Sequence, residues 1–305
     1  MTSANAAAAQ PAVRSRASER PARLRVGIVG AGRAGSALGA AFDRAGHHVI
    51  AATTSSRTYP LLGQLGDLPR LPAAEVAAAV QLVVLAVPDD TLPDLVQGLA
   101  VTGAVRPGQL VLHVSGRYGL DVLRPASDLG ALPIALHPAM TFTGGEADLA
   151  RLTGTAIAVT AAAELRVVGE ALAYELGGDP VFVPDELRTR WHAALSHGAN
   201  HLVTLVGQCV DLLTSAGVER PDLVLGPLMS AALDNAVRQG DAALTGPVSR
   251  GDAGTVAAHV ADLRGDPALD SYVALARATV ERAARAGRLK PAAADAVRAA
   301  LGGER

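Results

Sequence analysis

One stretch constrains the fold of this chain more than any other: residues 26–35, with the sequence VGIVGAGRAG. An apolar run leads into the spacing Gly-x-Gly-x-x-Gly, and the residues that follow have a helical apolar pattern. This order is typical of folds that bind a dinucleotide. Gly30 would make the tight turn, Gly32 would let the backbone approach a pyrophosphate, and Gly35 would let the helix pack on the strand. The alternative is an ordinary turn in an alanine-rich chain.

Composition excludes several classes of protein. The 305 residues include 27 Lys and Arg against 29 Asp and Glu, whereas nucleic-acid-binding domains carry a clustered basic excess. The single cysteine, Cys209, excludes an intramolecular disulfide and a cysteine metal cluster, and we expect no metal site. No apolar run approaches the ~18 residues that a membrane span needs. We therefore expect a soluble, cytoplasmic protein without nucleic-acid or membrane partners.

The pattern of apolar residues divides the chain into three parts. Residues 1–22 are alanine-rich without the apolar centre of a signal peptide, and we expect a disordered tail. Over residues 23–184, short apolar runs alternate with helical patterns, which predicts an α/β domain with a mostly parallel sheet covered on both faces. No strand pattern returns over residues 185–305, so we predict an all-α domain whose first helix is capped by Asp185. A ligand site in the cleft between the domains is then expected.

The individual elements follow from the same periodicities. The expected strands are 25–29, 48–53, 82–87, 110–114, 132–136, 155–160 and 181–183. The expected helices are 34–45, 73–80, 92–99, 164–176, 186–215 and 292–301, and further helical segments are expected to start near Pro221, Pro227 and Pro267.

Residues past the glycines indicate which dinucleotide is bound. Sites that prefer NAD place an acid about 20 residues beyond the turn, yet no acid lies between Arg44 and Gly66. Ser55, Ser56 and Arg57 stand in its place, and an arginine there suits a 2′-phosphate because the guanidinium can bind it through two parallel hydrogen bonds. This favours NADP(H), with a solvated polar loop as the alternative.

The strand ending near Val87 would supply the other side of the cofactor site. Ala86, Val87 and Pro88 would line the nicotinamide ribose, or they form an ordinary turn in which Asp89 or Asp90 caps the next helix. The cofactor-binding set predicted in this way is Gly30, Ala31, Gly32, Arg33, Ala34, Gly35, Ser55, Ser56, Arg57, Ala86, Val87 and Pro88.

Polar side chains follow two further expected strands. His113 and Ser115 come at the end of one strand, and His137 comes at the end of the next. Both ends should emerge at the same edge of the sheet as Gly30. We predict that Ser115 and His137 contact the ligand, although a hydrogen-bonded structural role is the alternative for each and the more common fate for His113.

The first helix of the all-α domain carries a polar stripe. At ~100° per residue, one face collects five polar side chains: His197, Asn200, Thr204, Gln208 and Asp211. Such a stripe lines a cleft or is satisfied in a helical interface. We predict ligand contact for His197 and Asn200, and keep a buried network at a dimer interface as the alternative for Gln208 and Asp211.

A loop rich in glycine covers residues 244–255, with Asp252 or Thr255 as a possible helix cap. Arg250, Thr245 and Gly246 could together receive a carboxylate. The alternative is a connection between helices with an exposed arginine.

Several of these motifs resemble one bacterial family. The glycine turn, Val87-Pro88-Asp89-Asp90, LHPAMTFTG at 136–144, ALDN at 232–235 and LTGPVSRGDAGT at 244–255 resemble a family that pairs a Rossmann-like NADP-binding domain with a helical domain of unknown function. The resemblance covers residues 24–289. More distantly, the layout is similar to the 6-phosphogluconate dehydrogenase-like superfamily, which includes pyrroline-5-carboxylate reductase, prephenate dehydrogenase and ketopantoate reductases. It implies a Rossmann-type fold.

The resemblance extends to single positions. His197-Gly198-Ala199-Asn200 occupies the place of the Lys-x-x-Asn of hydroxyacid dehydrogenases, with His replacing Lys. His137-Pro138-Ala139-Met140 resembles the run of prephenate dehydrogenases whose histidine meets a substrate hydroxyl. Residues 245–255 resemble the substrate loop of pyrroline-5-carboxylate reductase, where the helical domain also interlocks in a homodimer. A homodimer is therefore expected here.

These residues together predict an NADPH-dependent reductase of a small carboxylated carbonyl compound. Ketopantoate (2-dehydropantoate), of pantothenate biosynthesis, is the substrate that the family resemblance suggests first. His197 would donate the proton, Asn200 would orient the oxygen, Arg250 would hold the carboxylate, and Ser115 and His137 would complete the polar wall. The alternatives are an imine reductase of the pyrroline-5-carboxylate type and a non-catalytic NADP(H)-binding sensor or scaffold.

Overall fold

A computed structural model describes residues 23–53 and 59–302. The chain forms two compact units, residues 1–194 and 195–305, which we call the sheet unit and the helical unit. They divide within helix α8 (Arg188–Ser215), beyond the predicted boundary at 184/185. The predicted tail of residues 1–22 and the predicted cofactor residues Ser55, Ser56 and Arg57 lie outside the described residues.

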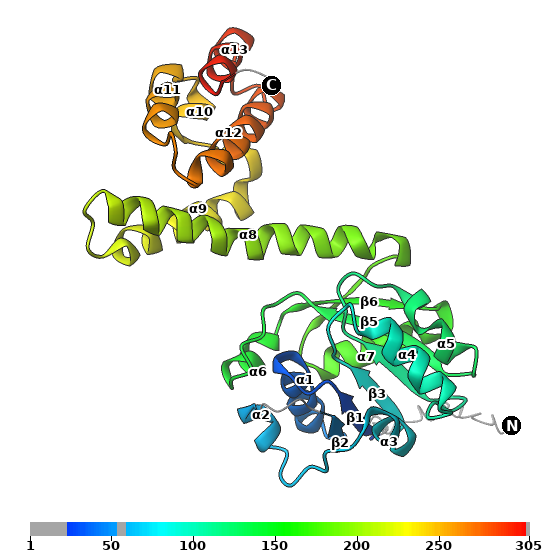
Figure 1. Ribbon diagram of the computed structural model, residues 1–305. Helices are drawn as coiled ribbons and strands as arrows, with labels where there is room; N and C mark the ends of the chain where they lie inside the picture. The colour runs from blue at the N-terminus through cyan, green and yellow to red at the C-terminus, as the bar shows by residue number, and fades with distance from the viewer. Residues whose placement is uncertain (1–22, 54–58, 303–305) are drawn as a thin grey trace, which may run out of the picture. The chain divides into compact units, whose positions relative to one another are not determined.

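The sheet unit is built on a seven-stranded sheet of order β2-β1-β3-β4-β5-β6-β7 (Figure 1). Every neighbouring pair is parallel except β5 and β6. The mostly parallel sheet predicted from the sequence is confirmed. The strands are β1 (Arg25–Val29), β2 (His48–Thr53), β3 (Leu82–Leu85), β4 (Leu110–His113), β5 (Leu132–Pro138), β6 (Ala156–Ala161) and β7 (Asp179–Phe182).

Helices cover both faces of this sheet, because the central strands are apolar on both sides. In β3, Leu82 and Val84 join one apolar cluster while Val83 and Leu85 join the other. The first cluster includes residues of α1 (Arg33–Arg44), α2 (Pro60–Gly63), α6 (Ala147–Leu152) and α7 (Arg166–Glu175). The second includes residues of α3 (Ala73–Ala79), α4 (Leu92–Val101) and α5 (Arg124–Ser127). Short 3₁₀ turns complete the unit: η1 (Leu120–Leu123), η2 (Ala163–Leu165) and η3 (Asp185–Leu187).

The helical unit contains the rest of α8 and several further helices, and no strand occurs among its described residues. They are α9 (Pro221–Gln239), η4 (Gly240–Ala243), α10 (Gly246–Arg250), α11 (Ala253–Asp262), α12 (Ala268–Arg285) and α13 (Pro291–Ala300). The apolar cluster of this unit is formed by α10 to α13 and includes Val248, Val256, Val280 and Val297. The predicted cap Asp252 is confirmed, since its Oδ1 accepts a hydrogen bond from the Thr255 amide at 3.1 Å.

The structure corrects two predictions about caps. Asp185 does not cap a helix; its Oδ1 accepts a hydrogen bond from the Leu120 amide at 2.6 Å and holds the turn before η1. Neither Asp89 nor Asp90 caps α4, whose N-terminus has no side-chain cap. For Asp185, the contact with Leu120, 65 residues earlier in the chain, is one that local sequence does not reveal.

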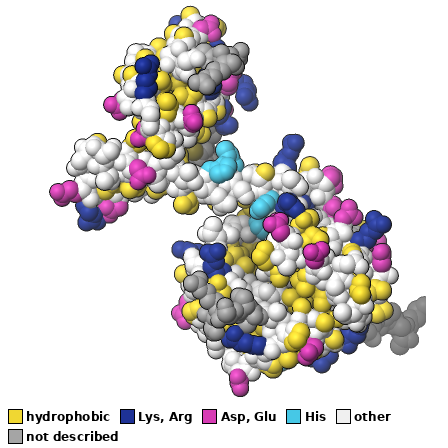
Figure 2. Space-filling view, viewed as in Figure 1, with side chains coloured by type: hydrophobic (Ala, Val, Ile, Leu, Met, Phe, Trp, Pro, Cys, Tyr) yellow, Lys and Arg dark blue, Asp and Glu magenta, His cyan; other side chains and the backbone are white. Residues whose placement is uncertain are grey.

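On the face drawn in Figure 2, basic and acidic side chains are interspersed over each unit. Within the described part of the chain, no helix combines the length and the apolar character that crossing a bilayer requires.

Candidate cofactor and substrate site

In the glycine turn between β1 and α1, two of the three glycines leave no room for a side chain, and the third faces open space. Gly30 has φ of +90°, and a Cβ there would lie 2.6 Å from the Ala86 carbonyl oxygen. A Cβ on Gly35 would lie 2.3 Å from the Gly30 carbonyl oxygen. At Gly32, by contrast, a Cβ would meet no atom within 4 Å. The turn and the close helix–strand packing are as predicted, and the open space lies at the glycine expected to face a pyrophosphate.

The N-terminus of α1 suits an anion. No side chain caps this 12-residue helix, and its first turn contains no acid. Its first amide groups therefore keep unused hydrogen-bonding capacity, and the helix dipole adds a partial positive charge. The residues present thus fit the pyrophosphate of a dinucleotide.

The parallel strands bring the predicted polar segments to the same edge of the sheet. Register pairs Val29 with Leu85, Leu85 with His113, and His113 with Ala135. The segments that follow these positions contain Gly30, Ala86, Ser115 and His137. The sheet unit therefore gathers these groups at one edge, where the sequence predicted them.

His113 and Ser115 are committed to holding the turn that follows β4. His113 is fully buried; its Nε2 pairs with the Gly119 carbonyl oxygen at 2.9 Å, and its Nδ1 accepts the Ser115 amide at 3.2 Å. Burial lowers the pKa of His113 to about 4, so the ring is neutral. The Ser115 hydroxyl, also buried, accepts the amides of Arg117 and Tyr118 at 3.2 and 3.1 Å. These contacts favour a structural role for Ser115 over the predicted ligand contact.

His137 is neutral and has a defined tautomer. Its Nδ1 accepts a hydrogen bond from Trp191 Nε1 at 3.2 Å, which places the ring proton on Nε2. Burial, followed by the charge of Arg188 and by His192, lowers the pKa of His137 to about 4. A neutral imidazole of this tautomer offers an N–H donor, whereas it has no proton to release at neutral pH.

Gly116 brings the backbone against two imidazoles. A Cβ at this position would lie 2.8 Å from His137 Nε2 and 2.6 Å from His192 Cδ2. The two rings meet edge to face, with centroids 5.8 Å apart. His192 and Trp191 thus belong to this site, although no sequence pattern separates them from the rest of their helix.

Arg188 anchors the start of α8 in the sheet unit and was not predicted. Its side chain is fully buried and donates to the carbonyl oxygens of Tyr118, at 3.0 Å, and of Ser115. Burial lowers its pKa to about 10, so the guanidinium remains charged at neutral pH. Because a buried arginine and an exposed one have the same sequence signal, only the fold identifies it.

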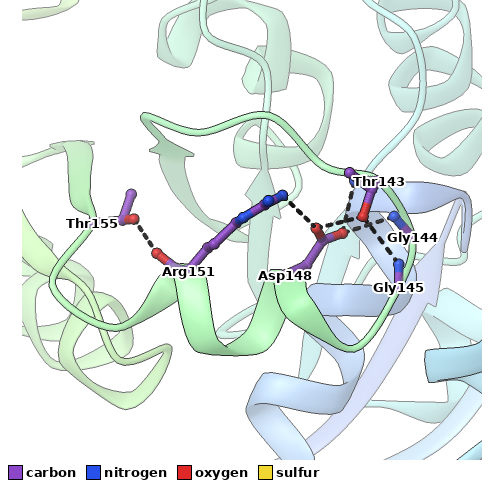
Figure 3. Close-up of polar contacts among 6 residues, drawn as sticks. All are labelled: Thr143, Gly144, Gly145, Asp148, Arg151 and Thr155. Atoms are coloured by element: carbon purple, nitrogen blue, oxygen red, sulfur yellow. Dashed lines mark hydrogen bonds and ion pairs between the residues drawn. The ribbon is translucent and has the colours of Figure 1, made fainter. Parts of the chain in front are cut away.

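The loop after β5 is held by Asp148, a second residue that the sequence did not indicate (Figure 3). This carboxylate is fully buried and accepts hydrogen bonds from the amides of Thr143 and Gly144 at 2.9 and 2.7 Å and from the Thr143 hydroxyl at 2.8 Å. The exposed Arg151 guanidinium lies 4.0 Å away. The carboxylate therefore fixes the shape of the segment that follows the His137 run.

This loop lies against the glycine turn. Gly144 has φ of +85°, and a Cβ there would approach Arg33 Cγ to 3.1 Å and Tyr59 Cδ1 to 2.6 Å. The run from His137 to Gly144 thus connects the histidine at the sheet edge to the predicted cofactor residue Arg33.

The remaining predicted residues lie in the helical unit. His197 and His201 are exposed, and their Nδ1 atoms lie 2.9 Å apart in a hydrogen bond; Asn200 and Thr204 are also exposed. Gln208 accepts a hydrogen bond from Ser271 at 2.7 Å within the same chain, which supplies a structural partner for this member of the stripe. Asp211 is exposed. Among the described residues, no three His, Cys, Asp or Glu side chains gather into a possible metal site.

The predicted carboxylate receptor surrounds α10. Thr245 precedes this helix, Gly246 begins it with φ of +90°, and Arg250 ends it with an exposed side chain.

Comparisons with known protein families agree with this architecture. The sequence matches the Rossmann-like domain over residues 9–138 and a domain of unknown function, DUF2520, over residues 155–279. The chain therefore carries a Rossmann-like domain followed by a DUF2520 domain. A search of curated proteins gave no match.

Solved structures show the same fold at low sequence identity. A Bacteroides fragilis protein, provisionally named an NADP oxidoreductase, is 22% identical with a TM-score of 0.70, over 84% of this chain and 98% of that one. A reductive aminase from Aspergillus terreus, in complex with NADPH, is 19% identical with a TM-score of 0.60, over 91% and 99%. A pyrroline carboxylate reductase from Plasmodium falciparum, with NADP bound, is 12% identical with a TM-score of 0.55, over 92% and 98%.

Proposed function

We propose that this protein is an NADPH-dependent reductase of a small carboxylated carbonyl compound. The observation that carries the proposal is the sheet edge, where the open glycine turn before α1 shares one rim with a neutral His137. Proteins of the same fold with NADP or NADPH in their structures support the choice of cofactor. Convergent polar groups beside an anion-binding turn are typical of an active site.

The cofactor would be held mainly by backbone. The first turn of α1 would bind the pyrophosphate, and the segment of Ala86, Val87 and Pro88 would lie beside the nicotinamide ribose. Ser55, Ser56 and Arg57 are proposed to bind the 2′-phosphate. When bound, NADPH supplies the hydride for the reduction.

Two histidines have separate proposed roles. His137, neutral and protonated on Nε2, would donate a hydrogen bond to the substrate oxygen. His197 would transfer a proton to the developing alkoxide, with Asn200 orienting that oxygen. Arg250, Thr245 and Gly246 would bind the carboxylate, while Ser115 would keep the turn before Tyr118 in place.

Ketopantoate is the first substrate to test, and reduction of an imine is the second candidate. The fold neighbours described as a reductive aminase and a pyrroline carboxylate reductase favour the imine. An iminium ion already accepts hydride readily, so an imine reductase depends less on a proton donor. A third possibility is an NADP(H)-binding sensor or scaffold without turnover.

Steady-state oxidation of NADPH by the full-length protein separates these functions. We expect turnover with ketopantoate, and a loss of about 100-fold in kcat for His197→Ala. Turnover only with cyclic imines such as pyrroline-5-carboxylate, with a small effect of His197→Ala, would establish the imine reductase. Tight binding of NADPH without oxidation in either substrate panel would refute both activities.

We also propose that the protein acts as a homodimer through α8 and α9. These helices expose large apolar side chains that no part of the described chain covers: Leu202, Val203, Leu223, Val224, Leu228, Leu233 and Val237. Apolar surface of this extent usually marks an interface, and the same surface on a second copy would be self-complementary across a two-fold axis.

A further inference from the structure

A hollow in the helical unit is lined by two arginines. Its volume is about 490 Å³, and its walls are formed by Leu244, Thr245, Ser249, Arg250 and Arg288. These residues come from the two ends of α10 and from the connection between α12 and α13. All of them belong to the helical unit.

Neither guanidinium group forms an ion pair with a carboxylate among the described residues. The nearby acids are engaged elsewhere: Asp241 pairs with Arg282 at 2.5 Å, and Asp252 accepts hydrogen bonds from Thr255. Hydrogen bonds from Thr255, with a smaller contribution from Arg250, hold the pKa of Asp252 below its usual range. Two positive charges around one hollow repel each other, and the attraction of both to an anion between them would offset this repulsion.

The backbone fixes where both arginines start. Gly251, with φ of +79°, ends α10 directly after Arg250, and a Cβ on Gly251 would lie 2.8 Å from the Ala293 Cβ. The Arg288 amide donates to the Ala283 carbonyl oxygen at 2.9 Å, and the next residue, Leu289, is buried in the apolar cluster. Both side chains thus extend from anchored positions.

The polar groups around the hollow leave donors for a ligand. Arg288 Nη2 donates to the Leu244 carbonyl oxygen at 3.2 Å, which orients the guanidinium and uses one of its five N–H groups. The buried Ser249 hydroxyl donates to the Gly246 carbonyl oxygen at 3.2 Å and is not free to donate to an anion. The side-chain donors left among the lining residues are those of Arg250, the remaining N–H groups of Arg288 and the Thr245 hydroxyl.

We propose that this hollow binds an oxoanion, a carboxylate or a phosphate group, between Arg250 and Arg288. Planar guanidinium groups bind both anions through paired, charge-assisted hydrogen bonds. Arg288 is the residue that this assignment adds, since the sequence indicated only Arg250. The anion site itself does not depend on the proposed function. Only the identification of the oxoanion with the carboxylate of the carbonyl substrate rests on it.

Calorimetric titration of the full-length protein tests the site without NADPH and at constant ionic strength. The probes are inorganic phosphate and 2-oxoisovalerate, a branched 2-oxo acid. Loss of a charged hydrogen-bond partner should weaken binding at least about tenfold in Arg250→Gln and in Arg288→Gln. Arg288→Lys, which keeps the charge and loses the fork, should lie between the wild type and Arg288→Gln.

Arg285→Gln is the matched control. It removes one exposed positive charge near the end of α12, outside the residues that line the hollow, and should change binding by less than about twofold. Tighter binding of 2-oxoisovalerate supports a carboxylate ligand, and tighter binding of phosphate supports a phosphorylated one. Either result supports the oxoanion site.

Three results would overturn the inference: no saturable binding of either probe, unchanged binding in Arg288→Gln, or an equal loss in Arg285→Gln. Circular dichroism of each variant verifies that the helices are retained. Because these titrations contain no NADPH, the site can fail while the reductase activity stands. Oxoanion binding in a protein without NADPH turnover would refute the activity alone.

Discussion

The sheet unit and the helical unit stabilise their helices in different ways. In the sheet unit, two apolar clusters cover both faces of the sheet, and α1 alone buries eight consecutive residues, from Gly35 to Phe42. In the helical unit, α10 to α13 share one apolar cluster. The only fully buried side chain of the 28-residue α8 is Arg188, which lies in the sheet unit, and the only one of the 19-residue α9 is Leu225. A long helix with so few fully buried side chains gains little packing energy from its own chain. This contrast supports the homodimer proposed above, in which a second copy would cover the exposed apolar side chains of α8 and α9.

The largest expected effect comes from adding a side chain at a position of the sheet unit where the backbone leaves no room for one. Gly35→Ala places a Cβ 2.3 Å from the Gly30 carbonyl oxygen, and we expect the free energy of unfolding to fall by about 3 kcal/mol or more. Urea denaturation measures this loss.

Gly32→Ala is the matched control for this packing, since a Cβ there meets no atom within 4 Å and φ is −76°. Its free energy of unfolding should remain near that of the wild type, while its affinity for NADPH should fall because the methyl group occupies the proposed pyrophosphate position. Equal destabilisation by both substitutions would contradict the described turn.

Next in size is the removal of the buried carboxylate that holds the loop after β5. Asp148→Ala leaves the amides of Thr143 and Gly144 without their acceptor, and we expect a loss of about 3 kcal/mol. Asp128→Ala removes an exposed acid of the same unit and should change the free energy of unfolding by less than about 0.5 kcal/mol. Similar urea midpoints for the two variants would show that the Asp148 contacts are not formed.

Lowering the pH is expected to reduce the free energy of unfolding by a smaller amount. The pKa of His113 is about 4 in the folded chain against a usual 6.5, so between these pH values the unfolded chain binds more protons. Stability is therefore complete above about pH 6.5 and falls as pH decreases towards 4, by about 2 kcal/mol between pH 7 and pH 5 from His113 alone. Urea denaturation at both pH values gives the difference in the free energy of unfolding between them. In His113→Gln, this difference should be smaller than in the wild type by that amount. A difference equal to that of the wild type would exclude His113 as its source.

The smallest change in the free energy of unfolding is expected from a substitution on α9. The same substitution tests directly whether α8 and α9 form the proposed interface. Leu228 is 62% exposed, so Leu228→Asp should change the stability of an isolated chain by no more than about 0.5 kcal/mol. It should nevertheless convert a homodimer into monomers, because a carboxylate cannot be buried unpaired in an apolar interface. Light scattering after gel filtration measures the mass. A wild-type monomer, or a variant that stays dimeric, would refute the proposed interface.

Sequence periodicity predicted the sheet well, because strands buried on both faces leave an unmistakable apolar run. β1 and β2 were predicted with both ends as observed. The short helices α2, α5 and α6, with four to six residues each, were missed. So few residues span at most two turns, and an apolar period cannot be recognised over that length.

Parts of the candidate site could be predicted where the backbone conformation requires a particular residue type. They could not be predicted where a side chain forms hydrogen bonds with backbone groups of a neighbouring turn. Only glycine fits at Gly30 and Gly35, so the turn could be read directly. Ser115 and His137 both follow a strand, yet the segment at Arg117 and Tyr118 returns to the Ser115 hydroxyl. No local pattern indicates that return, which commits the oxygen of the Ser115 hydroxyl to the turn as a hydrogen-bond acceptor.

The hydrogen bond between Trp191 and His137 has an optical consequence. Trp191 is the only tryptophan of the chain, so all indole emission comes from a ring whose N–H is bonded to His137 Nδ1. Protonation of His137, near pH 4 in the folded chain, replaces that acceptor with a donor and should change the emission. Reduced nicotinamide absorbs at the wavelengths where indole emits. The decrease in Trp191 fluorescence would therefore measure the fraction of protein that has NADPH bound. The protein thus carries its own fluorescent reporter at the edge of the sheet.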